Sequence, residues 1–171
     1  MAIKIRKYQA EDLPEMLAIW NEVVDEGRAF PHKEALDMES ASEFFAGQSH
    51  CGVAVDEASG KIHGLYILHP NNVGRCGHLS NASYAVSKNL RNRGIGRLLV
   101  EDSLEIAGEL GFRILQFNAV AKSNAAARAL YEKLGFVPLG CVPGGFLRKD
   151  GVYEDICLYY HPVGEGRSKQ E

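Results

Sequence analysis

A glycine-rich turn near the middle of the chain constrains the fold more than any other feature of the sequence. It consists of Arg91, Asn92, Arg93, Gly94, Ile95 and Gly96. Residues 76–87, just before it, alternate as expected of a β-strand. After it, apolar residues recur at helical spacing as far as Leu110, with acidic residues on the other face. The sequence therefore predicts a strand, a tight turn and an amphipathic helix in direct succession.

The remaining segments predict an α/β (α+β) fold with one mixed, mostly antiparallel sheet. Alternating runs indicate about seven strands, at 2–8, 51–56, 61–69, 76–87, 113–119, 136–147 and 152–160. Helical periodicity indicates three or four helices. Asp12 can cap the first, a short one covers 39–46, one follows the glycine turn, and one opens at Ser123 or Asn124. Residues 27–38 show no period, and we expect a loop there that can line a pocket.

Length and charge narrow the class of protein. The 171 residues correspond to one domain, expected over residues 1–162, with a flexible polar tail at 163–171. A net charge of −3 without a basic block argues against a nucleic-acid partner. No apolar run approaches the roughly 20 residues of a membrane span, and the N-terminus lacks the apolar segment of a secretion signal. We therefore expect a cytoplasmic protein with neither kind of partner.

The four cysteines lie outside the paired spacing of zinc and redox sites. We therefore expect no metal, and reduced thiols rather than disulfides. Cys51 and Cys157 fall in apolar strand-like runs, where a buried, inert thiol is the expectation.

The glycine turn has the chemistry of an anion site. Free backbone N–H groups at a helix N-terminus favour negative charge, and Arg91, Arg93 and Arg97 add positive charge at the same end. A tight turn without any ligand would explain the two glycines alone equally well. The dinucleotide fingerprint fails because Leu99 stands where its third glycine belongs, and no P-loop pattern occurs.

Two segments together resemble the GCN5-related N-acetyltransferase (GNAT) family. The turn fits the family's acyl-CoA signature, which has Gln or Arg, two variable residues, Gly, one variable residue, and then Gly or Ala. Residues 124–136 fit a second family pattern, N-x-x-A-x-x-L-Y-x-K-x-G-F. The resemblance covers about 3–160, most closely 84–136. It implies a single GNAT domain whose strands at 76–87 and 113–119 splay apart to form a notch for acetyl-CoA.

The resemblance also implies a cosubstrate site. The backbone of residues 91–96, with Arg97 beside it, would cradle the pyrophosphate. Backbone groups around Ala85 and Val86 would hold the pantetheine arm and polarise the thioester carbonyl. Asn124 and Ala127 would contact acetyl-CoA from the next helix.

Tyr131 would be the general acid for the departing thiolate, according to the same resemblance. Helical spacing places Asn124 and Tyr131 on one face of their helix, two turns apart. Without the resemblance, a helix cap would be the usual role of Asn124, and Tyr131 would be expected at the edge of the core.

The acceptor site is marked by fewer residues. Asn81 and Asn118 match family members that acetylate toxic amino-acid analogues such as azetidine-2-carboxylate, and the chain also resembles phosphinothricin-type acetyltransferases. These likenesses imply that Asn81, Asn118, Phe30 and His78 contact the acceptor, while a plain structural role for each asparagine stays open. The general base is left open between His78, His50, Glu22 and a chain of water molecules.

The resemblance thus implies an acetyl-CoA-dependent N-acetyltransferase that works by direct attack in a ternary complex, with no acyl-enzyme. Its acceptor would be the amino group of a small molecule, an amino acid or a toxic analogue of one. A protein N-terminal or lysine acetyltransferase and a non-catalytic acyl-CoA sensor are the alternatives. A homodimer is the assembly that the resemblance implies.

Overall fold

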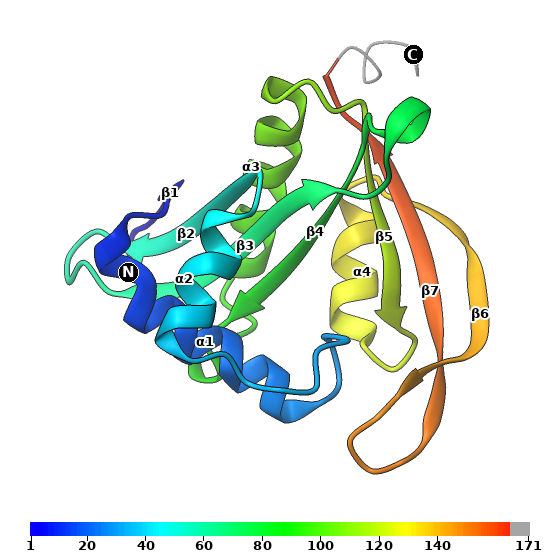
Figure 1. Ribbon diagram of the computed structural model, residues 1–171, viewed down its shortest axis with the longest axis horizontal. Helices are drawn as coiled ribbons and strands as arrows, with labels where there is room; N and C mark the ends of the chain where they lie inside the picture. The colour runs from blue at the N-terminus through cyan, green and yellow to red at the C-terminus, as the bar shows by residue number, and fades with distance from the viewer. Residues whose placement is uncertain (165–171) are drawn as a thin grey trace.

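A seven-stranded sheet forms the centre of the computed structural model, which describes residues 1–164 (Figure 1). Its strand order is β1-β2-β3-β4-β5-β7-β6, and every neighbouring pair is antiparallel except β4 and β5. The strands are β1 (Ile3–Lys7), β2 (His50–Asp56), β3 (Ile62–Pro70), β4 (Leu79–Val86), β5 (Ile114–Ala121), β6 (Val137–Leu147) and β7 (Tyr153–Pro162). The predicted mixed, mostly antiparallel sheet is confirmed.

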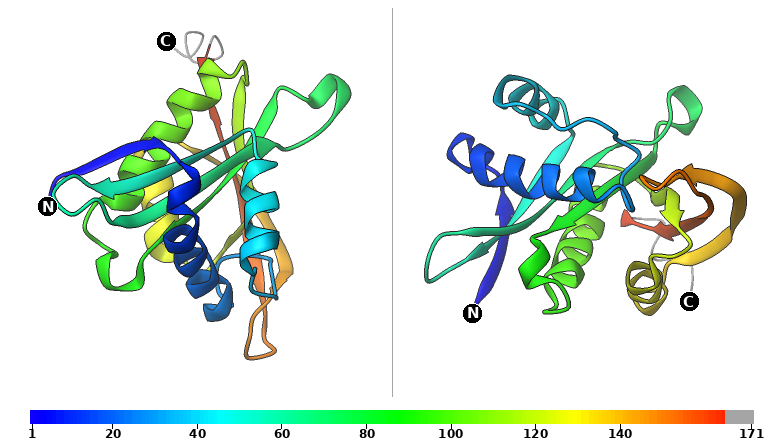
Figure 2. Two further views of the ribbon diagram at one scale, coloured as in Figure 1. Left: turned by 60° about the vertical axis from the view of Figure 1, so that its left-hand side comes forward. Right: turned by 90° about the horizontal axis from the view of Figure 1, so that it is seen from below.

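Four helices cover the two faces of the sheet (Figure 2). Helices α1 (Leu13–Glu26) and α2 (Met38–Ala46) lie on one face, and α3 (Ile95–Glu109) and α4 (Ala125–Lys133) lie on the other. The central strand β3 shows why both faces need cover. Its Leu65 and Ile67 belong to the core beneath α1, while Tyr66 and Leu68 belong to the core beneath α3. Successive strand residues point to opposite faces, so a strand that is apolar throughout is buried on both sides.

The sheet opens between β4 and β5, as predicted. The two strands pair in parallel only at Leu79–Ile114 and Ser80–Leu115, and then diverge. On the other side of β5, its pairing with β7 is interrupted between Phe117 and Val120. The divergence of β4 from β5 leaves the ends of both strands free to border a notch.

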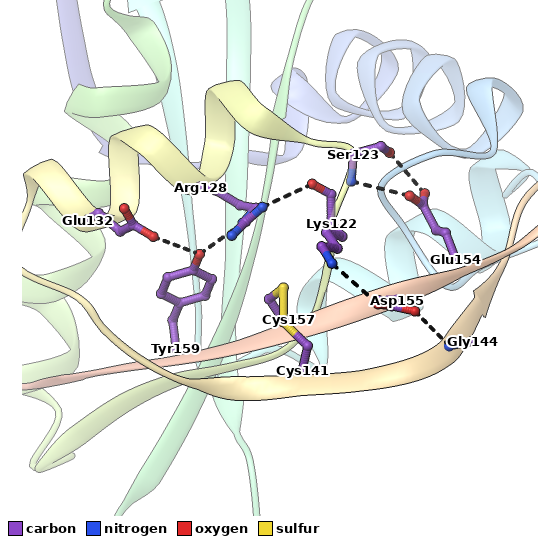
Figure 3. The surroundings of a disulfide bond; sticks show 10 residues. All are labelled: Lys122, Ser123, Arg128, Glu132, Cys141, Gly144, Glu154, Asp155, Cys157 and Tyr159. Atoms are coloured by element: carbon purple, nitrogen blue, oxygen red, sulfur yellow. Dashed lines mark hydrogen bonds and ion pairs between the residues drawn. A yellow bond between two sulfur atoms is a disulfide. The ribbon is translucent and has the colours of Figure 1, made fainter.

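The expectation of reduced thiols is wrong for two of the four cysteines. Cys141 and Cys157 form a disulfide (Figure 3). Cys51 is a buried free thiol, and Cys76 is an exposed one. Strands β6 and β7 place Cys141 directly opposite Cys157, with their Cα atoms 4.2 Å apart. That register depends on irregularities at Pro138–Gly140 and Val142–Phe146, which spacing along the sequence does not reveal.

The packed part of the chain reaches Val163, which is fully buried and donates its backbone N–H to the carbonyl of Arg113. Residues 165–171, most of the predicted tail, lie outside the described residues.

Candidate functional site

A cavity of about 950 Å³ occupies the notch between β4 and β5 and extends from the start of α3 to the loop after α1. Most of the predicted site residues line it. They are Phe30, Asn81, Val86, Arg91, Asn92, Gly94, Gly96, Arg97, Asn118, Asn124, Ala127 and Tyr131. Residues far apart in sequence thus meet in one cavity.

The glycine turn enters α3 with backbone donors exposed. Gly94 is the N-cap, with φ +83°, and no side chain caps the helix. Asn92, at φ 61°, is the only non-glycine residue with positive φ in the described part of the chain. A Cβ atom on Gly94 would meet no protein atom within 4 Å, so this side of the turn faces open space. Free N–H groups at the positive end of a helix fit a pyrophosphate, and this geometry therefore suits CoA.

Two of the three arginines near the turn are already ion-paired. Arg91 donates from Nε to the carbonyl of Val86 and pairs with Glu26 at 3.0 Å. Arg97 pairs with Glu101 at 2.8 Å. The positive charge predicted here is therefore partly neutralised by protein carboxylates, which leaves the backbone donors as the main anion contacts.

Tyr131, which α4 carries, lines the cavity. Its ring packs against Phe117 and Phe136, with centroids 4.4 Å and 5.6 Å away. Burial, together with the nearby Tyr159, raises the pKa of the Tyr131 hydroxyl above its ordinary value. The phenol therefore keeps its proton at neutral pH, which suits a proton donor.

Asn124, which also has a predicted role, is the N-cap of α4. Its side chain accepts a hydrogen bond from the N–H of Ala127 at 3.3 Å. The helix is held against β7 by Tyr159, whose hydroxyl accepts from Arg128 and donates to Glu132 (Figure 3). The hydrogen bonds to Tyr159 and the packing of the Tyr131 ring thus fix the helix that carries Tyr131.

The two asparagines that were predicted to contact the acceptor already have protein partners. Asn81 accepts from the N–H of Ala82 at 2.8 Å. Asn118 forms a two-way amide pair with Asn71, and its oxygen also accepts from Gln116. Sequence reasoning missed Asn71, which lies in the turn after β3, because nothing local links it to Asn118.

Several predicted residues do not line the cavity. His78 is exposed ahead of β4, Arg93 is exposed, and Ala85 and Ile95 are buried in the two cores. Of the candidate bases, His50 stacks on Tyr66, with ring centroids 5.8 Å apart. Glu22 accepts a hydrogen bond from the N–H of Lys88. We therefore do not carry His78, His50 or Glu22 forward as groups that touch the acceptor.

Two arginines that sequence reasoning did not select also line the cavity. Arg28 follows α1, and Arg148 lies at the tip of the β6–β7 hairpin. Local sequence gives no hint of the position of Arg148, because the hairpin tip reaches the cavity through a tertiary contact. Within residues 1–164, no group of three or more potential metal ligands occurs, and no helix has the length and apolar character needed to cross a membrane.

Comparison with known families decides the assignment. The sequence model of the acetyltransferase (GNAT) family matches residues 14–136. The chain belongs to the GNAT family. This GNAT protein is therefore an acetyl-CoA-dependent N-acetyltransferase, as predicted, with acetyl-CoA as cosubstrate.

Solved GNAT structures share the whole fold. A GCN5-related N-acetyltransferase from Kribbella flavida is 34% identical, covers 95% of this chain and 98% of its own, and superposes with a TM-score of 0.87. A phosphinothricin acetyltransferase from Sinorhizobium meliloti in complex with AcCoA is 23% identical, with 99% and 93% covered and a TM-score of 0.89. The second likeness concerns the fold alone.

Curated relatives point to more than one kind of acceptor. N-acetyltransferase aca1 of Schizosaccharomyces pombe is 29% identical over 91% of this chain and 82% of its own. The L-methionine sulfoximine/L-methionine sulfone acetyltransferase of Pseudomonas aeruginosa is 28% identical, over 84% and 85%. The peptidyl-lysine N-acetyltransferase YjaB of Escherichia coli is 30% identical, over 82% and 86%.

Proposed function

We propose that this GNAT enzyme acetylates the amino group of a small molecule, an amino acid or an amino-acid analogue. The observation that carries the proposal is the shape of the acceptor end, where the loop at 27–31 and the hairpin tip at 148 border the same cavity as Asn81 and Asn118. A cavity bordered on several sides suits a compact molecule. The relative from P. aeruginosa, whose name specifies a methionine derivative, supports this choice.

In the proposed mechanism, acetyl-CoA supplies an activated acetyl thioester that the amine attacks directly. The backbone of residues 91–96 binds the pyrophosphate, and Asn124 and Ala127 border the pantetheine arm. Backbone groups of Val86, which lines the cavity where Ala85 does not, orient the thioester carbonyl. Tyr131 is protonated at neutral pH, and it gives that proton to the sulfur that leaves.

Removal of the amine's proton is assigned to water. Among the described residues that line the cavity, the one carboxylate is Glu26, and Arg91 holds it in an ion pair. Both oxygens of this carboxylate face the Arg91 guanidinium, so neither is free to contact the amine. A free alkylamine, with a pKa near 10, must therefore lose its proton to solvent before or during binding.

Replacement of Tyr131 by Phe tests the mechanism. We expect kcat to fall roughly 100-fold, as for loss of a general acid, with acetyl-CoA affinity nearly unchanged. Thiol release with a panel of amino acids measures kcat, and calorimetry measures the affinity. Tyr153→Phe is the control, since Tyr153 is 68% exposed and does not line the cavity. An unaltered kcat in Tyr131→Phe would remove Tyr131 from this role, and turnover with any acceptor excludes a non-catalytic sensor.

A protein acceptor is the second candidate, supported by the likeness to a peptidyl-lysine acetyltransferase. Mass spectrometry of a lysate incubated with labelled acetyl-CoA separates the two. Label on small molecules alone supports our proposal, and label on protein lysines or N-termini supports the alternative.

We also propose that the enzyme acts in the cytoplasm, where acetyl-CoA is available, and that it is a homodimer. The edge strand β6 supports the dimer, because it exposes Val137, Leu139, Val142 and Leu147. Light scattering measures the mass in solution, and a monomeric mass would exclude the dimer.

A further inference from the structure

Two segments far apart in sequence, the loop after α1 and the tip of the β6–β7 hairpin, border the same cavity. Gly27 ends α1 in the left-handed conformation, with φ +64°, and its carbonyl accepts from the N–H of Lys149 at 3.3 Å. The ammonium group of Lys149 donates to the carbonyl of Asp25 at 2.8 Å. A Cβ on Gly27 would lie 2.6 Å from the Cβ of Lys149. The loop after α1 and the tip of the β6–β7 hairpin are therefore in direct contact.

This contact places two arginines at the same end of the cavity. Arg28 and Arg148 each flank the contact, and both line the cavity. Arg148 is bonded to Asp150, two residues away in the same hairpin. Arg28 has no hydrogen-bond or ion-pair partner among residues 1–164. Glu26 is paired with Arg91 and Asp150 with Arg148, so the guanidinium of Arg28 carries the positive charge here that no protein carboxylate offsets among residues 1–164.

The two asparagines that line the same cavity are less available for an anion. Both polar atoms of the Asn118 amide are engaged with Asn71, and Gln116 also bonds to its oxygen. The oxygen of Asn81 is held by the N–H of Ala82. By contrast, a guanidinium presents a planar pair of donors that matches a carboxylate.

We propose that Arg28 and Arg148 bind an anionic group of the acceptor, a carboxylate or a closely similar oxyanion, and so select amino acids over simple amines. The inference rests on the proposed small-molecule function and names residues for it that neither the family signature nor the sequence patterns indicated. The acceptor thus carries a carboxylate in addition to the amine. Asn81 and Asn118 are left for the amine or for polar groups of the side chain.

The test compares acceptors that differ only at the carboxylate. Thiol release is measured with free amino acids, including L-methionine sulfone, with their carboxamides, with the corresponding decarboxylated amines, and with a lysine-containing peptide. We expect the wild-type enzyme to prefer the acids. Arg28→Gln and Arg148→Gln should each raise KM for the acid roughly tenfold or more, as for loss of a hydrogen bond to a charged group. The acid-to-amide preference should shrink by the same factor, with KM for acetyl-CoA unchanged.

Three further variants separate binding from folding. Arg113→Gln makes the same chemical change at an exposed position outside the cavity and should change nothing. Asp150→Asn removes the carboxylate that pairs with Arg148 but leaves the charge of Arg148 in place. The preference for acids should therefore persist. Arg28→Lys should recover part of it.

The outcomes discriminate between this inference and the proposed function. If both arginine variants still acetylate amino acids and their acid-to-amide preference is unaltered, the inference is overturned but the proposed function is not. Preference for amides or decarboxylated amines would also overturn it, while the small-molecule function stands. Acetylation of the peptide only, or of none of the acids, would overturn both.

Discussion

Asp12 has a different role from the helix cap that sequence alone predicts. Its carboxylate receives two hydrogen bonds from Arg6, at 2.7 and 2.9 Å, and one from the N–H of Gln9. The side chain is 9% exposed. The hydrogen bonds from Arg6, and secondarily the N–H of Gln9, lower the pKa of Asp12 below 3.8 despite burial. The residue therefore joins β1 to the start of α1 rather than capping the helix.

Asp12→Asn should accordingly destabilise the protein by about 2 kcal/mol at neutral pH, because a partly buried charge-assisted pair is lost. Since folding lowers the pKa, the contribution is complete above the unfolded value of about 3.8 and disappears as the pH falls through the folded value. Urea unfolding at several pH values measures it. Glu11→Gln, at the exposed neighbour, is the control, and a difference between variant and wild type that does not shrink in acid would contradict the assignment.

The free cysteines should differ sharply in reactivity. Cys51 is 1% exposed, its thiol donates to the carbonyl of Phe45, and burial raises its pKa to about 12. Because the thiolate is the reactive form, iodoacetamide at pH 8 should label the exposed Cys76 in the native protein and leave Cys51 unlabelled until unfolding. Peptide mass mapping checks this, and rapid native labelling of Cys51 would show that the site opens.

Residues that are close in sequence were the predictable ones. Asn124 and Tyr131 reach one cavity because a single helix carries both. Arg148 and Asn71 were missed, because each reaches the site or its residues through a contact with a distant segment. Arg28 lies in the loop at 27–38 that was expected to line a pocket, but nothing in that loop singled it out. Local periodicity carries no record of such contacts.

At the scale of elements, the glycine turn should be sensitive to bulk at one position. In Gly94→Trp the indole would occupy the open space above the N-terminus of α3, so we expect loss of acetyl-CoA binding by calorimetry. Gly60→Trp is a matched control. Gly60 also has positive φ, at +72°, and open space around it, but it lies in the β2–β3 hairpin, away from the cavity. Loss of binding in both variants would indicate general damage, and retained binding in Gly94→Trp would exclude the turn as the pyrophosphate site.

Helices and strands were predicted well because each is encoded by a local period. Strand register was not. Glycines at positive φ, Gly140 and Gly144, lie in the two irregular stretches of β6. These irregularities decide which residues of β7 face those of β6, and periodicity along the sequence does not specify them.

At the scale of the whole molecule, the order of the last strands determines how the site is completed. Strand β7 pairs with β5 on one side and with β6 on the other, so β6 is the edge and has one neighbour. The notch between β4 and β5 follows from this arrangement, because β7 rather than β4 supplies most of the pairing of β5. Periodicity along the chain does not reveal that order, and the family resemblance implied only that the strands at 76–87 and 113–119 splay apart.

An edge strand held on one side depends more on a covalent link than a central strand does. The Cys141–Cys157 disulfide closes a segment with a sequence separation of 16 and joins β6 to β7 beside Val120, which lines the cavity. Closing a loop of this length stabilises a protein by up to about 3 kcal/mol. We therefore expect dithiothreitol to lower the urea midpoint of the wild-type protein, and Cys141→Ser with Cys157→Ser to reproduce that lower midpoint without reductant.

The controls for the disulfide use the remaining thiols. Cys76→Ser should leave both the midpoint and its response to dithiothreitol unchanged, because Cys76 is exposed and free. Reduction in the cytoplasm would leave the two sulfurs as thiols, and rapid alkylation of cells followed by mass mapping measures which form is present there. Tyr159 holds α4 to β7. We therefore expect loss of the disulfide to lower the stability of the protein more than it weakens acetyl-CoA binding. An unaltered urea midpoint after complete reduction would show that β-sheet pairing alone holds this edge.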